Sequence, residues 1–122
     1  REDVVEIFMD ADLDHQSYAH LGFNSLGTAA DAWHTGGVED RNVDWDTDIE
    51  VAAHVGAADW SLEVAIRFSE PHLSPPAPGA IWGFNFVRVY RGAEFSQWVR
   101  TFARGGHSPD DFGFLVFGGR RP

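Results

Sequence analysis

Apolar and polar side chains alternate along residues 60–68, and this alternation constrains the fold more than any other feature of the sequence. The apolar side chains that share one face of this segment are Leu62, Val64, Ile66 and Phe68. A second row of the same kind consists of Trp82, Phe84 and Phe86. A period of two residues is typical of β-strands with one buried face, because successive side chains point to opposite sides of a sheet.

Runs of this kind predict seven strands, near residues 3–10, 17–24, 26–33, 49–56, 60–68, 80–91 and 112–117, separated by clusters of Gly, Pro and Asp. Residues 69–73 are expected to form one helical turn, and residues 95–104 suit a short helix and an extended loop equally well. Short strands joined by turns predict a single all-β domain over residues 1–122, an antiparallel, jelly-roll-like β-sandwich. The expected core residues are Val5, Ile7, Leu62, Val64, Ile66, Phe68, Trp82, Phe84, Phe86 and Phe114.

The charge balance excludes some classes of partner. The chain of 122 residues has 19 acidic residues against nine basic ones, all of them arginine, for a net charge of −10. Nucleic-acid binding is disfavoured, because it depends on basic side chains that neutralise phosphates. No apolar run approaches the roughly 20 residues of a membrane-spanning helix, so no membrane insertion is expected in this segment. Cysteine is absent, which excludes disulfides and thiolate metal sites.

The two ends of the sequence suggest a piece of a longer protein. A strand-like run follows residues 1–3 directly, with no initiator methionine and no signal peptide before it, and residues 118–122 follow the last predicted strand as a short tail. We therefore expect this domain to be covalently attached to other domains.

Two acidic clusters are candidate cation sites. One consists of Asp10, Asp12 and Asp14, directly after a predicted strand, and the other spans residues 44–48. Alternate carboxylates in a loop suit Ca²⁺, which takes six to eight oxygen ligands. An EF-hand is excluded because His15 occupies the position that requires glycine. A solvated acidic loop is the alternative for both clusters.

Other chemistry has weaker support in the sequence. The six histidines lack the spacings of zinc hydrolases, so a zinc site would need ligands that the fold alone brings together. Haem would have to be held by Met9 and a histidine, since Met9 is the only methionine and lysine is absent. A glycosidase site, which needs a pair of carboxylates, is a further alternative in so acidic a chain. The tryptophans in polar surroundings, which suit either packing or sugar stacking, are Trp33, Trp45 and Trp98.

Taken in order, several stretches resemble a family 9 carbohydrate-binding module. They are residues 3–10, 18–28, 60–68, 82–88, 95–98 and 107–113. The resemblance implies a β-sandwich that binds the ends of glucan and xylan chains and carries structural Ca²⁺, here with Asp10, Asp12 and Asp14 as candidate ligands. It also implies that the family's N-terminal strands lie outside this chain, and that the domain is an accessory to a larger protein that is secreted, periplasmic or on the cell surface.

The same resemblance implies the sugar-binding residues. Glu6, Trp98 and Asn85 match binding positions of the family, and His20 and His107 stand where the family usually has other residues. Glu6 has an alternative role as the partner of Arg88 in a structural ion pair. The competing functions are a haem-binding or purely structural relative of the same sandwich, and part of a glycoside hydrolase. No catalytic residue is expected in a domain that only binds sugar.

Overall fold

The computed structural model of this protein describes residues 3–36, 40–91, 94–101 and 106–118. The described residues form nine strands and one short 3-10 helix. They are β1 (Val4–Asp10), β2 (Tyr18–Asn24), β3 (Ala29–His34), β4 (Arg41–Asn42), β5 (Asp48–Val55), β6 (Trp60–Arg67), β7 (Ile81–Tyr90), β8 (Glu94–Gln97), η2 (Pro109–Asp111) and β9 (Gly113–Val116). All seven predicted strands are present, and β4 and β8 are additional.

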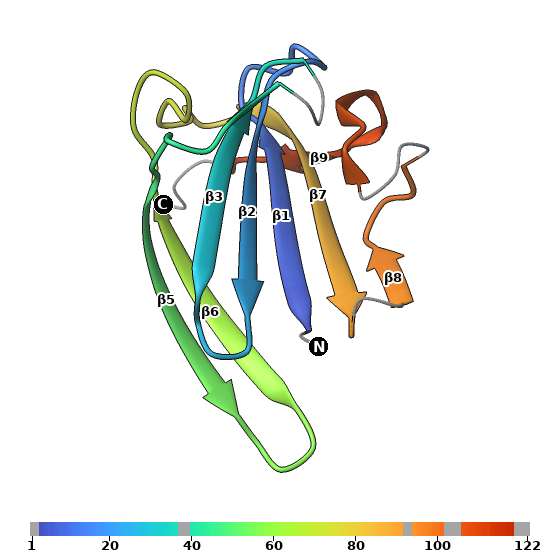
Figure 1. Ribbon diagram of the computed structural model, residues 1–122. Helices are drawn as coiled ribbons and strands as arrows, with labels where there is room; N and C mark the ends of the chain where they lie inside the picture. The colour runs from blue at the N-terminus through green and yellow to red at the C-terminus, as the bar shows by residue number, and fades with distance from the viewer. Residues whose placement is uncertain (1–2, 37–39, 92–93, 102–105, 119–122) are drawn as a thin grey trace.

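The strands form two antiparallel sheets that pack as the layers of a β-sandwich (Figure 1). The larger sheet has the order β4-β3-β2-β1-β7-β8, and β9 also pairs with β7. The second layer is the β5–β6 hairpin. The prediction of an all-β antiparallel sandwich is therefore confirmed. Among the described residues, no helix has the length and apolar character needed to span a membrane.

The inner core lies between these two layers. Its buried residues are Met9, Ala19, Leu21, Phe23, Trp33, Leu73 and Trp82. The predicted core residues that are buried in it or packed against it are Ile7, Leu62, Val64, Ile66, Phe68, Trp82 and Phe84. Alternation therefore identified the inward faces of β1, β6 and β7 correctly.

Two core predictions are wrong. Phe114 is 60% exposed, because in β9 the neighbouring Leu115 points into the core and Phe114 points away from it. Phe86 is 42% exposed, although it shares a face with Phe84, because it borders a cleft between the layers instead of a packed contact. Val5 also lines this cleft and is only partly buried.

A second apolar cluster, which the alternation of the sequence does not predict, lies on the outer face of the large sheet. It consists of Phe8, Tyr18, Val87 and Phe112. Phe8 and Val87 are fully buried because β1 and β7 lie in the middle of the sheet, where the loop containing η2 covers them. Central strands buried on both faces do not show a simple alternation.

The two local expectations have different outcomes. Residues 70–73 form a turn, in which the Leu73 amide donates to the Ser69 carbonyl at 3.0 Å, and the structure has no helix at the place where one helical turn was expected. Residues 94–97 form strand β8 in place of the short helix, and Trp98 N donates to the Phe86 carbonyl at 2.8 Å. Residues 102–105, at the end of that candidate helix, lie outside the described residues.

Candidate functional site

Antiparallel pairing brings several polar and aromatic side chains together on the outer face of the large sheet. Phe8 lies opposite His20 in the β1–β2 register, and Tyr18 lies opposite His34 in the β2–β3 register. These even-numbered positions therefore share the sheet face that points away from the β5–β6 hairpin. We call the following group the histidine face: Glu6, Tyr18, His20, His34 and His107.

Glu6 and His20 form a direct pair within the histidine face. His20 Nε2 donates to Glu6 Oε1 at 2.6 Å, and the two side chains are only 19% and 17% exposed. The alternative pairing of Glu6 with Arg88 is wrong. Arg88 instead bonds to Asp3 at 3.1 Å, because it lies on the opposite face of β7 from Val87, the residue that is paired with Glu6.

His107 reaches the histidine face from the loop before η2. Its Nδ1 shares a hydrogen bond of 2.7 Å with Tyr18 Oη, and its ring meets the His20 ring edge-on at 4.8 Å between centroids. Burial, together with His20, His34 and Arg41 nearby, lowers the pKa of His107 to about 4. Burial also raises the pKa of Tyr18 to about 12. Both side chains are therefore neutral at pH 7.

The three imidazoles of this face converge. One ring nitrogen of each of His20, His34 and His107 lies within 4.8 Å of a ring nitrogen of the other two. His34 is fully buried, and its ring stacks on Tyr18 at 4.7 Å with an interplanar angle of 5°. No spacing motif in the sequence indicates this cluster. The available signal was that His20 lies in one predicted strand, 17–24, and His34 directly follows the next, 26–33, but whether the two side chains meet depends on the register.

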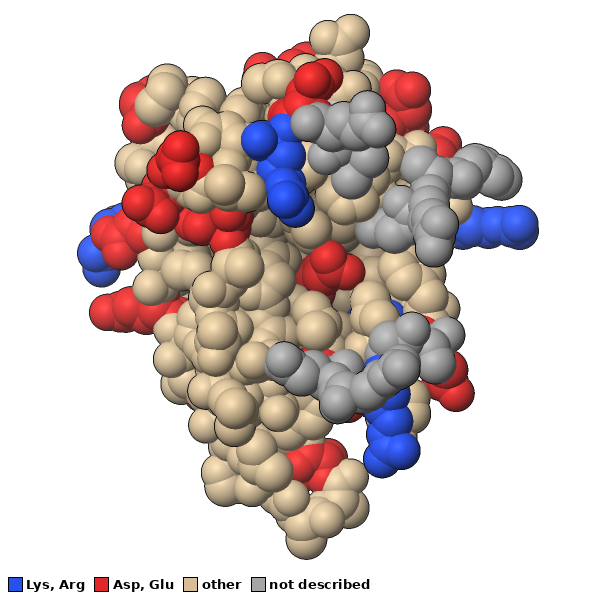
Figure 2. Space-filling view, in the orientation of Figure 1, with Lys and Arg blue, Asp and Glu red and all other residues tan. Residues whose placement is uncertain are grey.

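A pocket of about 380 Å³ opens beside the Glu6–His20 pair. Its polar lining includes Glu6, His20 and Arg41, while the small residues Gly22 and Ala30 line it from β2 and β3. A side chain built on Gly22 would meet no atom within 4 Å, so the small residues create this hollow. The visible face of the molecule carries mostly acidic charge (Figure 2), in agreement with the net charge of −10.

Two predicted site residues lie away from this pocket. Asn85 is fully buried, and its side chain donates to the Val99 carbonyl at 3.1 Å and accepts from the Val99 amide at 3.0 Å. Trp98 is 59% exposed, and its ring packs edge-on against Phe84, which belongs to the inner face of β7. The structure thus brings together Glu6, His20 and His107 and separates them from Trp98.

The other two tryptophans in polar surroundings are packing residues. Trp33 is 8% exposed and stacks on His72 at 4.1 Å, and Trp45 contacts both rings. Met9 is also buried, at 2% exposure, in the inner core. Because Met9 follows Phe8 in β1, it points to the opposite side of the sheet from the three histidines of the histidine face. A haem site formed by Met9 with one of those three is therefore ruled out.

The first acidic cluster folds into a tight turn after β1. Asp10 is fully buried and accepts hydrogen bonds from the amides of His15 and Asp14, at 2.9 and 3.2 Å. Carboxylate oxygens of Asp10, Asp12 and Asp14 lie within 4.8 Å of one another. Burial, with the carboxyl groups of Asp12 and Asp14 close by, raises the pKa of Asp10 to about 6.

The second acidic cluster is arranged differently. Asp48 pairs with Arg67 at 2.9 Å across the β5–β6 hairpin, and the exposed Asn42 side chain accepts from the Asp44 amide at 3.0 Å. Within the described part of the chain, the carboxylates of residues 44–48 do not converge as those of residues 10–14 do.

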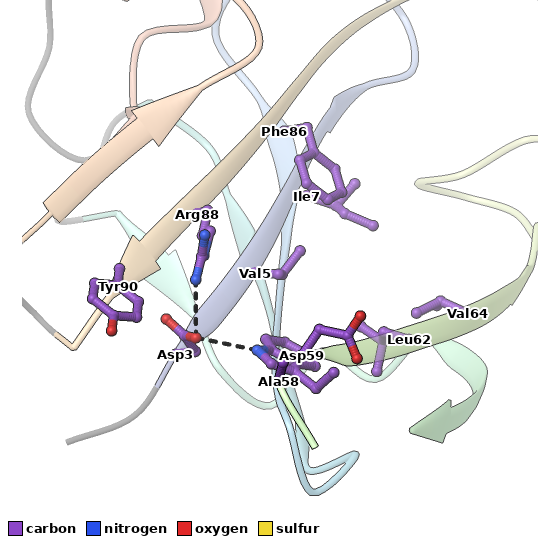
Figure 3. Close-up of a pocket in the computed structure, with 11 residues that line it drawn as sticks. Asp3, Val5, Ile7, Ala58, Asp59, Leu62, Val64, Phe86, Arg88 and Tyr90 are labelled. Carbon is purple, nitrogen blue, oxygen red and sulfur yellow. Dashed lines mark hydrogen bonds and ion pairs between the residues drawn. The ribbon is translucent and has the colours of Figure 1, made fainter. Parts of the chain in front are cut away.

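A larger cleft, of about 720 Å³, lies between the large sheet and β6 (Figure 3). Its walls are apolar, with Val5, Ile7 and Phe86 on one side and Leu62 and Val64 on the other. Its polar end is an ion pair in which Asp3 accepts from both Arg88 and Trp60 at 3.1 Å. Burial acts to raise the pKa of Asp3, but these hydrogen bonds outweigh it and lower the pKa.

Comparison of the chain with family models, with curated proteins and with solved structures finds no match. The family 9 resemblance consequently remains a proposal that rests on the sequence motifs.

Proposed function

We propose that this domain is a non-catalytic carbohydrate-binding module whose ligand occupies the pocket beside Glu6 and His20. The observation that carries the proposal is the Glu6–His20 pair, held at 2.6 Å at the edge of a hollow on the sheet face. The pair is only partly exposed and is fixed by β1 and β2, so its polar groups are already in place before a ligand binds.

The lining of this pocket supports a sugar ligand. A pyranose presents hydroxyl groups at its rim and C–H groups on its faces, and it therefore needs both polar partners and apolar contact. Glu6 offers acceptor oxygens and Arg41 offers donors, while Gly22, Ala30 and Ala32 leave a low apolar floor between them. A neutral sugar is also compatible with the acidic surface of the domain, because it brings no charge to be repelled.

The finer parts of the proposal rest on the family 9 resemblance. They are a preference for the ends of glucan or xylan chains and an accessory role in carbohydrate breakdown by a larger exported protein. Trp98 and Asn85, which the resemblance also implies, lie outside the pocket, so we assign ligand contact to Glu6 and His20 instead.

The test is a calorimetric titration of short gluco- and xylo-oligosaccharides into the protein in a buffer that contains Ca²⁺ and no transition metal. We expect a dissociation constant in the millimolar-to-micromolar range, which corresponds to about −4 to −8 kcal/mol. Gly22→Val should abolish binding by filling the hollow, and Ala52→Val, at an exposed position of β5, should leave it unchanged. Equal binding by Gly22→Val would move the site elsewhere, and no binding by the wild type would overturn the proposal.

Hydrolysis is tested in the same samples. A glycoside hydrolase would release reducing sugar from the oligosaccharides over hours, and we expect no release. Release that is lost in Glu6→Gln would favour the hydrolase over the binding module.

We also propose a structural Ca²⁺ ion at the turn formed by residues 10–14. Three carboxylates that approach within 4.8 Å, one of them fully buried, repel one another unless a proton or a cation neutralises them. Carboxylate oxygens in a flexible loop are the ligands that Ca²⁺ prefers. The melting experiment described in the Discussion tests this proposal.

A further inference from the structure

We propose that His20, His34 and His107 form a binding site for a divalent late transition-metal ion, Zn²⁺ or Cu²⁺, which adjoins the sugar pocket at His20 and is distinct from the acidic turn. The three ligands come from β2, from β3 and from the loop before η2. They are distant in sequence, and only the fold brings their ring nitrogens within 4.8 Å of one another.

The spacing is close to that of a metal-bound set. A tetrahedral ion with bonds of about 2.0 Å holds its ligand nitrogens about 3.3 Å apart. Each nitrogen–nitrogen distance, which is at most 4.8 Å here, would therefore have to shorten by no more than about 1.5 Å when a metal ion binds. Small rotations of the imidazole rings are enough for this change. His107 lies on a loop and not on a strand, so it is the ligand best able to make this adjustment.

Hydrogen bonds occupy one nitrogen of two of these rings. His20 Nε2 donates to Glu6, and His107 Nδ1 is bonded to Tyr18 Oη. Because each bond engages one ring nitrogen, a metal ion would take the other nitrogen of the ring, Nδ1 of His20 and Nε2 of His107. Metal-ligating histidines almost always have such a partner, commonly a carboxylate, which fixes the tautomer and the orientation of the ring.

Aromatic packing alone explains only part of this arrangement. The His20 ring stacks on Phe8 at 4.4 Å with an interplanar angle of 9°, and the His34 ring stacks on Tyr18. Stacking accounts for the ring faces, but it does not require the polar edges of three imidazoles to converge. Apolar side chains would stack equally well without the cost of burying polar nitrogen atoms.

The donor set selects the class of ion. Three imidazoles suit Zn²⁺ and Cu²⁺, whereas Ca²⁺ and Mg²⁺ prefer oxygen ligands. Three protein ligands leave a fourth position open. His20 also lines the pocket of about 380 Å³, so the site borders this pocket.

The experiment uses the tag-free protein, stripped with EDTA and then dialysed free of it. Zn²⁺ and Cu²⁺ are titrated separately by calorimetry against a competing chelator, and the Cu²⁺ complex is examined by electron paramagnetic resonance. We expect one equivalent of tightly bound ion and nitrogen hyperfine splitting in the Cu²⁺ spectrum. His20→Gln and His107→Gln should each weaken binding at least 100-fold, and Glu6→Gln should weaken it about 10- to 100-fold.

The controls separate this site from the other two. His54→Gln, at an exposed position of β5, and Asp12→Asn, in the acidic turn, should bind both metals like the wild type. Gly22→Val should lose sugar binding but keep metal binding, so the failure of one proposal does not imply the failure of the other. Circular dichroism and melting curves confirm that each variant is folded. Wild-type affinity in both His20→Gln and His107→Gln, or a Cu²⁺ spectrum with oxygen ligands only, would overturn the metal site.

Discussion

The Glu6 carboxylate and the His20 imidazole are joined by a hydrogen bond of 2.6 Å that connects β1 to β2 on the outer face of the large sheet. The pair is also where the proposed sugar pocket and the proposed metal site meet, because Glu6 lines the pocket and orients His20. Variants at this pair therefore affect both proposals, and Gly22→Val in the pocket and His107→Gln in the metal site are the variants that distinguish them.

Glu6→Ala should remove sugar binding and also lower the free energy of unfolding by about 1–3 kcal/mol, because the partly buried His20 Nε2 loses its acceptor. Glu63→Ala, at an exposed position of β6, is the matched control and should change neither quantity. Urea denaturation and sugar titration of the two variants measure both effects. Unchanged sugar affinity in Glu6→Ala would contradict the role of Glu6 in the pocket.

Asn85→Ala should destabilise the fold by about 1–3 kcal/mol, since it removes buried hydrogen bonds to both backbone groups of Val99. Because Asn85 is fully buried, we expect the variant to bind sugar within a factor of two of the wild-type affinity under conditions in which it is fully folded. Gln16→Ala, at an exposed site, serves as the control. A large loss of affinity with unchanged stability would restore Asn85 as a direct sugar contact.

The outer apolar cluster should contribute as much to stability as the inner core. Phe8→Ala is expected to cost about 3–5 kcal/mol, because Phe8 is fully buried between neighbouring rings. Phe114→Ala, at a position that is 60% exposed, should cost less than about 1 kcal/mol. Chemical denaturation compares the two variants, and equal losses of stability would contradict the burial of Phe8 or the exposure of Phe114.

Removal of calcium should lower the melting temperature if the ion binds at residues 10–14. Because a ligand that binds only the native state stabilises it by mass action, EDTA should lower the melting temperature and excess Ca²⁺ should restore it. Asp12→Asn should abolish this response, and Asp44→Asn, in the other acidic cluster, should retain it. A melting curve that responds to neither EDTA nor Ca²⁺ supports the solvated loop.

In metal-free buffer, the buried carboxyl of Asp10 should make stability depend on pH. Folding raises the pKa of Asp10 from 3.8 to about 6, so between these values the native state keeps a proton that the unfolded chain has released. The resulting stabilisation is complete below pH 3.8 and is lost as the pH rises through about 6. Asp10→Asn lacks this titration, and the stability of the wild type relative to this variant should fall over that range. A difference in stability between the wild type and Asp10→Asn that stays constant over this pH range would show that folding does not raise the pKa of Asp10.

The sequence by itself determined the fold class and most of the inner core. In β6, alternation places Leu62, Val64 and Ile66 on one face, and the structure packs all three against the inner core. Such local patterns are reliable because a strand buried on one face requires a period of two residues, whatever its partners are.

The tertiary structure alone decided the histidine face, the outer apolar cluster and the separation of Trp98 from Glu6. These depend on register and strand order: Tyr18 meets His34 only because β2 pairs with β3 at that offset, and His107 arrives from a segment far along the chain. A shift of one residue in either pairing would turn these side chains to the opposite face. The energy that selects the register comes from contacts between distant segments, and no local sequence pattern contains it.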